Sequence, residues 1–353
     1  MNKVNAFLKS FGWPRIIIAI FLLVLFVVGG IYKIPTDMSI NDVIVRFGMN
    51  GILVLSMIPM IQSGCGLNFG IPVGLIAGLL SAVISLEFYM TGFPGMLFAM
   101  LIALVFSAVF GLGYGLLLNK VKGDEMIIAT YVGYSFVALM NIMWIALPFR
   151  NPSSVLGFKG EGLRATISVD GYWYGALSNF LKIVITRDSS GRERLAIPTG
   201  MILFFALMSL LMWLFFKSKI GTAITAVGSN PEYARAAGIN INKMRVISTV
   251  LSTSIASVGI IIYQQSFGFI QLYNAPNNFM FPTVAAILIG GASVNKASIV
   301  NVIIGTLLFQ GILTMTPTVI NTVTQTDMAE TIRLIISNGM IVYALTRRST
   351  QSR

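Results

Sequence analysis

Residues 217–245 read KSKIGTAITAVGSNPEYARAAGININKMR, a polar stretch that lies between two long apolar runs. Within it, Asn230 can cap free backbone amides and Pro231 suits the first position of a helix. Glu232 would face the positive end of the helix dipole. Gly238 can take the left-handed conformation that ends a helix. The stretch therefore predicts a helix of about two turns that begins at Pro231 and stops before Gly238.

The role of this predicted helix has two interpretations. A free helix so short is marginal in water and needs a surface to pack on. It is either a cytoplasmic turn between two membrane helices or a docking helix for a partner protein. The second interpretation rests on Tyr233, Ala236 and Ala237, which share one face at i, i+3, i+4 spacing.

The composition is that of a polytopic membrane protein. Of the 353 residues, 56% are hydrophobic and 10% are charged, whereas soluble domains carry about 25% charged residues. There is no histidine and one cysteine, Cys65, which excludes Ser-His-Asp and Cys-His catalysis, histidine metal sites and an intrachain disulfide. No Gly-Lys pair occurs, so the chain has no P-loop. We expect no catalytic residue and no metal site.

Apolar runs of about 20 residues predict an all-α fold with about ten transmembrane helices. The expected spans are 14–32, 42–62, 66–86, 94–118, 126–148, 198–216, 246–268, 279–293, 298–316 and 329–346. Gly64 and Pro72 around the start of the third span, and Pro282 and Gly290 in the eighth, predict broken helices. Such breaks are tolerated where the backbone is buried in protein or lines a cavity.

The charges predict one transmembrane domain over residues 1–353 with both termini in the cytoplasm. Cytoplasmic segments are enriched in Lys and Arg, and more than half of the 24 basic residues lie on the side of the N-terminus. That side includes the loop 217–245, whereas residues 149–197 form a long extracytoplasmic loop. In this long loop RATISVDGYWY is strand-like, and NFLKIVI (179–185) predicts a short amphipathic helix on the membrane surface. Because topology accounts for the net charge of +12, no nucleic-acid partner is expected.

Glycines within the fourth span also predict where helices approach closely. Small residues at helix interfaces let backbones come together in a membrane. We therefore expect Gly111, Gly113 and Gly115 to be helix contacts.

The sequence resembles a known family from about Gly51 to Leu345. The run AVGSNPEYARAAGINI (226–241) is similar to the cytoplasmic coupling loop of permeases of ABC importers. The similarity continues through FPTVAAILIGGASVNKASIVNVIIGTLLFQGIL (281–313) and, more loosely, through GLNFGIPVGLIAGLLSA (66–82). This branch of the family moves ribose and other simple sugars, nucleosides, autoinducer-2 and branched-chain amino acids. By resemblance, the ATPase-coupling residues are Gly228, Asn230, Pro231, Glu232, Tyr233, Ala236, Ala237 and Gly238.

The resemblance implies a translocation subunit rather than an enzyme. ATP and Mg would be bound by separate ABC ATPase subunits, so no cofactor is expected in this chain. A second permease, identical or homologous, would complete the membrane part, and an extracytoplasmic binding protein would deliver the cargo across a bacterial cytoplasmic membrane. The implied cargo is a simple sugar. A nucleoside is the alternative, because similar sugar permeases carry an acidic residue where this chain has Asn68. A secondary transporter is a more distant alternative.

Uncharged polar side chains within the spans are the candidates for the substrate path. Ionisable groups deep in a bilayer cost about 2.5–3.5 kcal/mol, and those of this chain lie near the predicted span ends, which favours a permease driven from outside the membrane. The uncharged polar groups are Asn50, Gln62, Ser63, Asn68, Asn141, Gln264, Gln265, Ser266 and Gln310. Among them, we take Asn68, Asn141, Gln264, Gln265 and Ser266 as the candidates. Amides and hydroxyls suit neutral, hydroxyl-rich solutes, but they also hydrogen-bond between helices. Because neighbours on a helix point about 100° apart, we expect unequal roles for Gln264 and Gln265.

Overall fold

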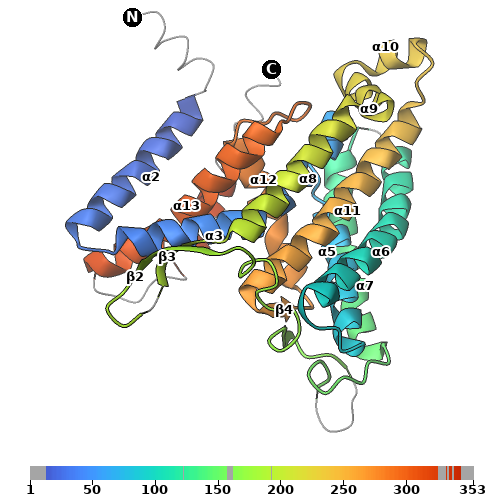
Figure 1. Ribbon diagram of the computed structural model, residues 1–353. Helices are drawn as coiled ribbons and strands as arrows, with labels where there is room; N and C mark the ends of the chain where they lie inside the picture. The colour runs from blue at the N-terminus through green and yellow to red at the C-terminus, as the bar shows by residue number, and fades with distance from the viewer. Residues whose placement is uncertain are drawn as a thin grey trace, which may run out of the picture.

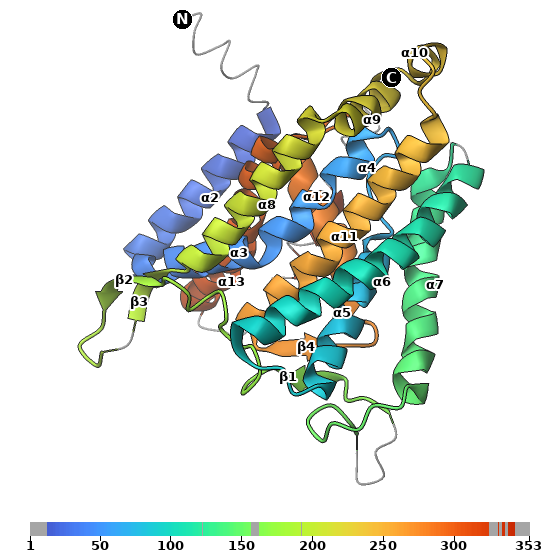
Figure 2. The same ribbon diagram turned by 45° about the vertical axis from the view of Figure 1, so that its right-hand side comes forward.

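The computed structural model describes residues 13–121, 123–156, 162–191, 193–324, 331, 334–335 and 338–342, which form a bundle of helices (Figures 1 and 2). The helices are α2 (Trp13–Ile31), α3 (Thr36–Leu55), α4 (Ile58–Gln62), α5 (Ile71–Glu87), α6 (Gly92–Lys120), α7 (Glu125–Ala146), α8 (Thr199–Lys217), α9 (Lys219–Ser229), α10 (Pro231–Ala236), α11 (Ile241–Phe267), α12 (Met280–Ile289) and α13 (Ile299–Thr324). The strands are β1 (Thr166–Ser168), β2 (Ile183–Arg187), β3 (Glu193–Ile197) and β4 (Phe269–Gln271), and η1 (Ala275–Phe279) is a 3-10 helix.

The predicted helical, multi-span character is confirmed. Within the described residues, six helical stretches are long and apolar enough to cross a membrane: Thr36–Gln62, Gly92–Lys120, Glu125–Ala146, Thr199–Lys217, Ile241–Phe267 and Ile299–Thr324. Shorter apolar helices, Arg15–Ile31, Ile71–Glu87 and Ala275–Ile289, occupy the first, third and eighth predicted spans. Most of the tenth predicted span, 329–346, lies outside the described residues. The count of ten spans and the sides of the termini stay predictions.

The predicted break between the second and third spans is present. α3 ends at Leu55, and residues 63–70 form a largely buried, non-helical link between α4 and α5. At the break, the Ser56 carbonyl accepts a hydrogen bond from the Ser252 hydroxyl of α11 at 2.6 Å. Ser252 accepts from the Asn68 amide at 2.8 Å, and the Asn68 carbonyl accepts from the Tyr114 hydroxyl at 3.0 Å. These bonds satisfy polar groups where the backbone leaves the helical conformation.

α11 is the central helix of the bundle and packs against α3, α5 and α6 (Figure 2). On the α5 side, a methyl group at Gly74 would lie 2.6 Å from the Thr253 carbonyl oxygen, and one at Gly78 would overlap the Ser257 carbonyl. The two helices therefore approach backbone to backbone, as small residues permit in membranes.

The predicted helix contacts in α6 are confirmed at two of the three glycines. A methyl group at Gly111 would overlap the Thr253 hydroxyl, and one at Gly115 would lie 3.2 Å from the Cα atom of Val246. At Gly113 a methyl group would have no neighbour within 4 Å in the described part of the chain. The prediction for Gly113 is therefore wrong, because this residue is on the other side of the helix from its two neighbours in the series.

The long loop between α7 and α8 contains strands rather than a helix. The strand-like patch is confirmed at β1, which pairs antiparallel with β4, just beyond the end of α11. The amphipathic helix predicted at residues 179–185 is wrong, because β2 begins at Ile183 and forms a hairpin with β3. Four consecutive β-branched residues, 183–186, favour the strand. The hairpin is attached to α3, since the Asn41 side-chain oxygen accepts from the backbone N–H of Ala196 at 3.0 Å.

Charged groups support the turn of this hairpin. Arg194 pairs with Asp188 at 3.3 Å and reaches Asp37 of α3 at 3.9 Å. The backbone N–H of Ser189 and the Arg194 guanidinium hold the pKa of the Asp188 carboxyl below its ordinary value. Because the Arg194 and Asp188 side chains are both about a third exposed, solvent weakens their ion pair, and its main effect is on the shape of the turn.

The segments that the charges predict to be cytoplasmic lie at one end of the bundle. There the Asn119 amide of α6 donates to the Asn242 carbonyl at 2.8 Å, and Arg245 of α11 pairs with Glu125 of α7 at 3.1 Å. α9 and α10 lie at the same end (Figure 1), and the long loop lies at the other. The structure thus groups the segments as predicted, while the side of the membrane that each end faces stays a prediction.

Gly111→Ala should destabilise the protein, whereas Gly113→Ala should not. At Gly111 the methyl group would overlap Thr253 and lie 3.0 Å from the Cα atom of Val250, and such overpacking costs about 1–3 kcal/mol. At Gly113 the space is open, and alanine is favoured over glycine in a helix by about 1 kcal/mol. Thermal unfolding in detergent should show a lower midpoint for Gly111→Ala alone. An equal loss in both variants would contradict a close α6–α11 contact at Gly111.

Candidate functional site

The polar stretch 217–245 forms α9, α10 and the start of α11. The predicted helix start is confirmed, since Pro231 is the first residue of α10 and the Asn230 side-chain oxygen accepts from the backbone N–H of Tyr233 at 3.0 Å. The predicted end is confirmed as well, because Gly238 has a φ of +78°. Both ends of α10 are therefore capped by the residues that the sequence indicated.

One face of α10 is buried and the opposite face is exposed. A small apolar cluster joins α10 to α9 and to the start of α11, and its buried members are Ile224, Val227, Ala234 and Met244. On the predicted docking face, the Tyr233 side chain is 69% exposed, and Ala236 and Ala237 are exposed too. No described residue covers this face, so a partner could reach it.

Glu232 and Gly228, the other coupling candidates, have different surroundings. Glu232 is in the first turn of α10 and pairs with Arg235 at 3.3 Å. Both of these side chains are exposed, so the pair itself contributes little to stability. Gly228 is buried at the end of α9, where a methyl group would overlap the Gln62 carbonyl.

Sequence reasoning missed α9 as a separate helix. Its start carries a clear signal, because the Ser218 hydroxyl accepts from the backbone N–H of Gly221 at 3.2 Å. Ser218 is followed by apolar residues at helical spacing, Ile220, Ile224 and Val227. The polar stretch is therefore a two-helix unit rather than a loop with one short helix.

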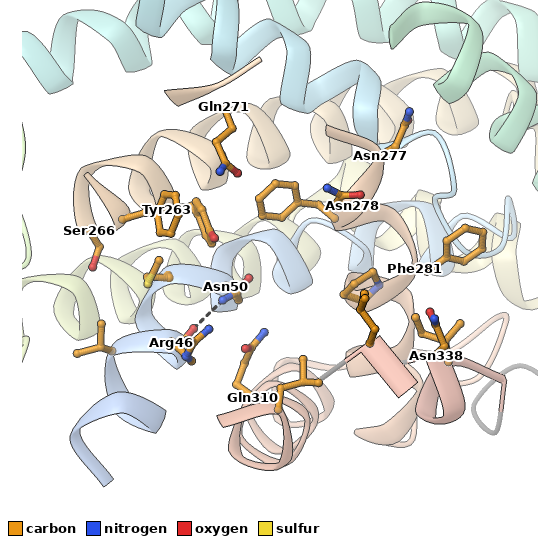
Figure 3. Close-up of a pocket in the computed structure, with 18 of the residues that line it drawn as sticks. Arg46, Asn50, Tyr263, Ser266, Gln271, Asn277, Asn278, Phe281, Gln310 and Asn338 are labelled. Carbon is orange, nitrogen blue, oxygen red and sulfur yellow. Dashed lines mark hydrogen bonds between the residues drawn. The ribbon is translucent and has the colours of Figure 1, made fainter. Parts of the chain in front are cut away.

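A cavity of about 780 Å³ (Figure 3) lies beside the C-terminal end of α11. α10 precedes the other end of this helix. The cavity lining comes from α3, α7, α11, β4, η1, α12, α13 and the described residues between 334 and 341. The polar side chains of the lining, tyrosines aside, are Asp42, Arg46, Asn50, Ser266, Gln271, Asn277, Asn278, Gln310 and Asn338. The volume is in the range of small-molecule sites, about 300–1,000 Å³.

The cavity combines aromatic rings with uncharged amides. The Tyr263 ring meets Phe279 edge to face with centroids 4.9 Å apart, and it lies 5.4 Å from the Phe267 ring. In Figure 3, Asn50 and Gln310 lie on one side of the space and Gln271 on the other. Amides that converge from several elements can donate and accept hydrogen bonds to a neutral solute, while the rings supply an apolar surface.

Among the five predicted path residues, Ser266 lines this cavity. Asn68 is 0% exposed and lies in the hydrogen-bond chain between Tyr114 and Ser252. Asn141 of α7 donates to the Asn274 side chain at 3.1 Å. Neither Asn68 nor Asn141 is part of the cavity lining, and their role in substrate passage stays a prediction.

Gln264 and Gln265 also lie outside the lining, and their surroundings differ as expected for neighbours on a helix. The Gln265 side-chain oxygen accepts from the backbone N–H groups of Leu177 and Ser178 at 3.0 and 3.2 Å. The Gln264 side chain is 1% exposed, and its amide has no hydrogen-bond partner among the described residues. Gln265 thus attaches the long loop to α11; whether either residue meets a substrate stays a prediction.

α3 carries a further sequence signal for the cavity, which extends beyond Asn50. Asp42, Arg46 and Asn50 follow one another at intervals of four residues, so they form a polar stripe on one helix face. Within the stripe, the Asn50 amide donates to the Arg46 carbonyl at 3.0 Å. A polar stripe on an otherwise apolar membrane helix indicates a surface that faces a cavity rather than lipid.

The sequence profile of one protein family, described as "Branched-chain amino acid transport system / permease component", matches residues 39–345. The chain is similar to the probable ABC transporter permease protein YphD of Escherichia coli strain K12, with 27% identity over 122 residues, 34% of this chain and 36% of that protein. It is also similar to the nucleoside ABC transporter permease protein NupB of Lactococcus lactis subsp. cremoris strain MG1363, with 29% identity over 108 residues, 30% of this chain and 29% of that protein. The chain thus spans about a third of the length of these curated relatives. No solved structure matches the chain significantly.

Gln265→Leu should lower stability far more than Gln264→Leu. Leucine at 265 would leave the backbone donors of Leu177 and Ser178 without their acceptor, at about 1–3 kcal/mol for each donor that stays buried. Leucine at 264 removes an unpaired buried amide, so it should be neutral or stabilising. Thermal unfolding of the two purified variants in detergent measures the difference. Equal midpoints would mean that the Gln265 bonds contribute nothing to holding the long loop.

Proposed function

We propose that this chain, which belongs to the family of permease components of branched-chain amino acid transport systems, is the transmembrane subunit of an ATP-driven ABC importer for a simple sugar. It receives the sugar from an extracytoplasmic binding protein. In a bacterial cytoplasmic membrane it pairs with a second permease, which is identical or homologous. Separate ATPase subunits bind ATP and Mg and drive the transport. A nucleoside is the second candidate cargo, favoured by the similarity to a relative named as a nucleoside permease.

The observation that carries this proposal is the uncovered face of α10. Its two alanines leave room beside the exposed Tyr233 ring, so the surface of another protein can approach the helix backbone. Aromatic residues are enriched at protein interfaces, which supports a docking role for this ring. Residues 237–240 join α10 to α11, so a force applied to α10 would reach the central helix of the bundle.

The cavity supports the cargo side of the proposal. A sugar presents hydroxyl groups around a ring with small apolar patches, which matches amides from several elements next to aromatic side chains. The Asn50, Gln271 and Gln310 amides would bond hydroxyls, while Tyr263 and Phe279 would contact the ring. A nucleoside base could stack on the same aromatic rings, so it remains the alternative.

Uptake into membrane vesicles tests the proposal directly. Vesicles carrying the chain, its ATPase subunits and its binding protein should accumulate radiolabelled cargo when ATP is supplied. An agent that collapses the proton gradient should leave this uptake intact. Competition with unlabelled sugars and nucleosides decides between the two cargo classes. Uptake that needs the gradient and ignores ATP would identify a secondary transporter instead.

Gly238→Val should weaken assembly with the ATPase subunits, whereas Gly171→Val should not. Both glycines have a φ of +78° and open space around them, so valine strains each by a similar amount, about 1–2 kcal/mol. Only Gly238 ends the docking helix; Gly171 is in the long loop. Co-purification of tagged ATPase subunits with each variant measures assembly. Equal recovery with both variants would mean that α10 is only a turn.

Gln310→Leu should raise the cargo concentration for half-maximal uptake by about tenfold, the factor that one lost hydrogen bond is worth. The matched control is Gln264→Leu, which removes a buried amide outside the cavity lining. Its half-saturating concentration should stay near that of the unmodified protein. A large effect of Gln264→Leu and no effect of Gln310→Leu would contradict a cargo path through the cavity. The path would then include Gln264, as the sequence analysis predicted.

A further inference from the structure

Three separate segments meet at the end of the bundle that carries α10. They are the end of α4 with the link that follows it, the end of α9, and the link between α12 and α13. The contact residues are Gln62, Gly64, Gly228 and Ala297, which we call the three-segment junction. The docking proposal uses the outer face of α10. Of the junction it includes Gly228 alone, and it gives no role to Gln62, Gly64 or Ala297.

The first contact of the junction joins backbone to backbone. Gly64 has a φ of +74°, and a methyl group placed on it would lie 3.1 Å from the Cα atom of Gly228. A methyl group on Gly228 would in turn overlap the Gln62 carbonyl. No side chain lies between the two segments at this point, and close-packed protein compresses very little. A displacement of α9 therefore displaces the α4–α5 link as well, because the two backbones are in direct contact.

The second contact extends the junction to α13. The Gln62 side-chain amide donates to the Ala297 carbonyl at 2.6 Å, and Ala297 is buried. After Ala297 the chain enters α13, and Asn301 stabilises the first turn of this helix. The Asn301 side-chain oxygen accepts from the Ser298 backbone N–H at 2.9 Å. The Asn301 side-chain amide donates to the Gly290 carbonyl at 2.7 Å. The start of α13 is thus a firmly bonded segment on which Gln62 can act.

The junction lies behind two walls of the cavity. α4 continues from α3, which supplies Arg46 and Asn50, while α13 supplies Gln310. A third wall, the end of α11, is joined to α10 directly through residues 237–240. α13 packs against α3 and α12, and the Gln62 bond adds a direct polar link from the end of α4 to the segment that leads into α13.

We propose that Gln62 is a positioning residue that couples the α9–α10 unit to α13, so that the cavity walls move together when the ATPase subunits act on α10. This inference rests on the proposed function and adds to it a second route, besides α11, by which force reaches the cavity. Gln62 is not part of the cavity lining; it acts through the Ala297 carbonyl.

The test measures cargo molecules taken up per ATP hydrolysed in vesicles with the full transporter. Gln62→Leu should still co-purify with the ATPase subunits and hydrolyse ATP, but the uptake per ATP should fall about tenfold. Gln62→Lys keeps a donor and should recover part of the loss. The matched control, Asn119→Leu, removes an amide-to-carbonyl bond of similar length, 2.8 Å to Asn242, at the same end of the bundle but outside the junction. Its uptake per ATP should not change.

A reversible link in one protein sample makes the result independent of folding. In a Cys65→Ala background, the pair Gln62→Cys and Ala297→Cys should be uncoupled when reduced. Joining the two thiols with a short bis-methanethiosulfonate reagent should restore uptake per ATP, and a thiol reductant should abolish it again. Normal coupling in Gln62→Leu, or equal coupling in the linked and reduced states, would overturn the inference. A failure of the unmodified protein to use ATP for uptake would instead overturn the proposed function.

Discussion

The hydrogen bond from the Ser252 hydroxyl to the Ser56 carbonyl is the contact on which much of the bundle depends. An unpaired backbone carbonyl in an apolar interior costs several kcal/mol, so a membrane helix can break only where another group satisfies it. Here the break after α3 allows α4 and the buried link 63–70 to turn back into the bundle. This turn places Gln62 beneath α9 and leaves the polar stripe of α3 beside the cavity.

α11 connects the two ends of the molecule, because its residues pack against α10 at one end and line the cavity at the other. At one end Met244 belongs to the apolar cluster that holds α10, and at the other Tyr263 and Ser266 line the cavity. With a rise of about 1.5 Å per residue, its 27 residues span about 40 Å. Glycines of α5 and α6 let neighbouring helices approach its backbone closely, so α11 can shift only together with those neighbours.

The sequence predicted best what depends on local chemistry. The caps of α10 at Asn230 and Gly238 follow from residue types within a few positions, and long apolar runs predicted the helices. What depends on tertiary contacts was out of reach. Asn68 and Gln265 have the polarity of path residues, yet their bonds to Ser252 and to residues 177–178 come from segments distant in the chain. The hairpin at β2 was not predicted, because an apolar run of this length fits either a helix or a strand and the β-branched residues 183–186 decide for the strand.

The pairing of β1 with β4 has a consequence for the order in which the protein is made. β1 is in the loop that precedes α8, whereas β4 follows α11, so four helices are synthesised between the two strands. Until α11 has entered the membrane, β1 has no partner and the backbone donors of residues 177–178 have no Gln265 to accept them. The long loop therefore reaches its final fold late in biogenesis. In a nascent chain stalled before α11, the unpaired N–H and C=O groups of β1 would be free to pair with another chain.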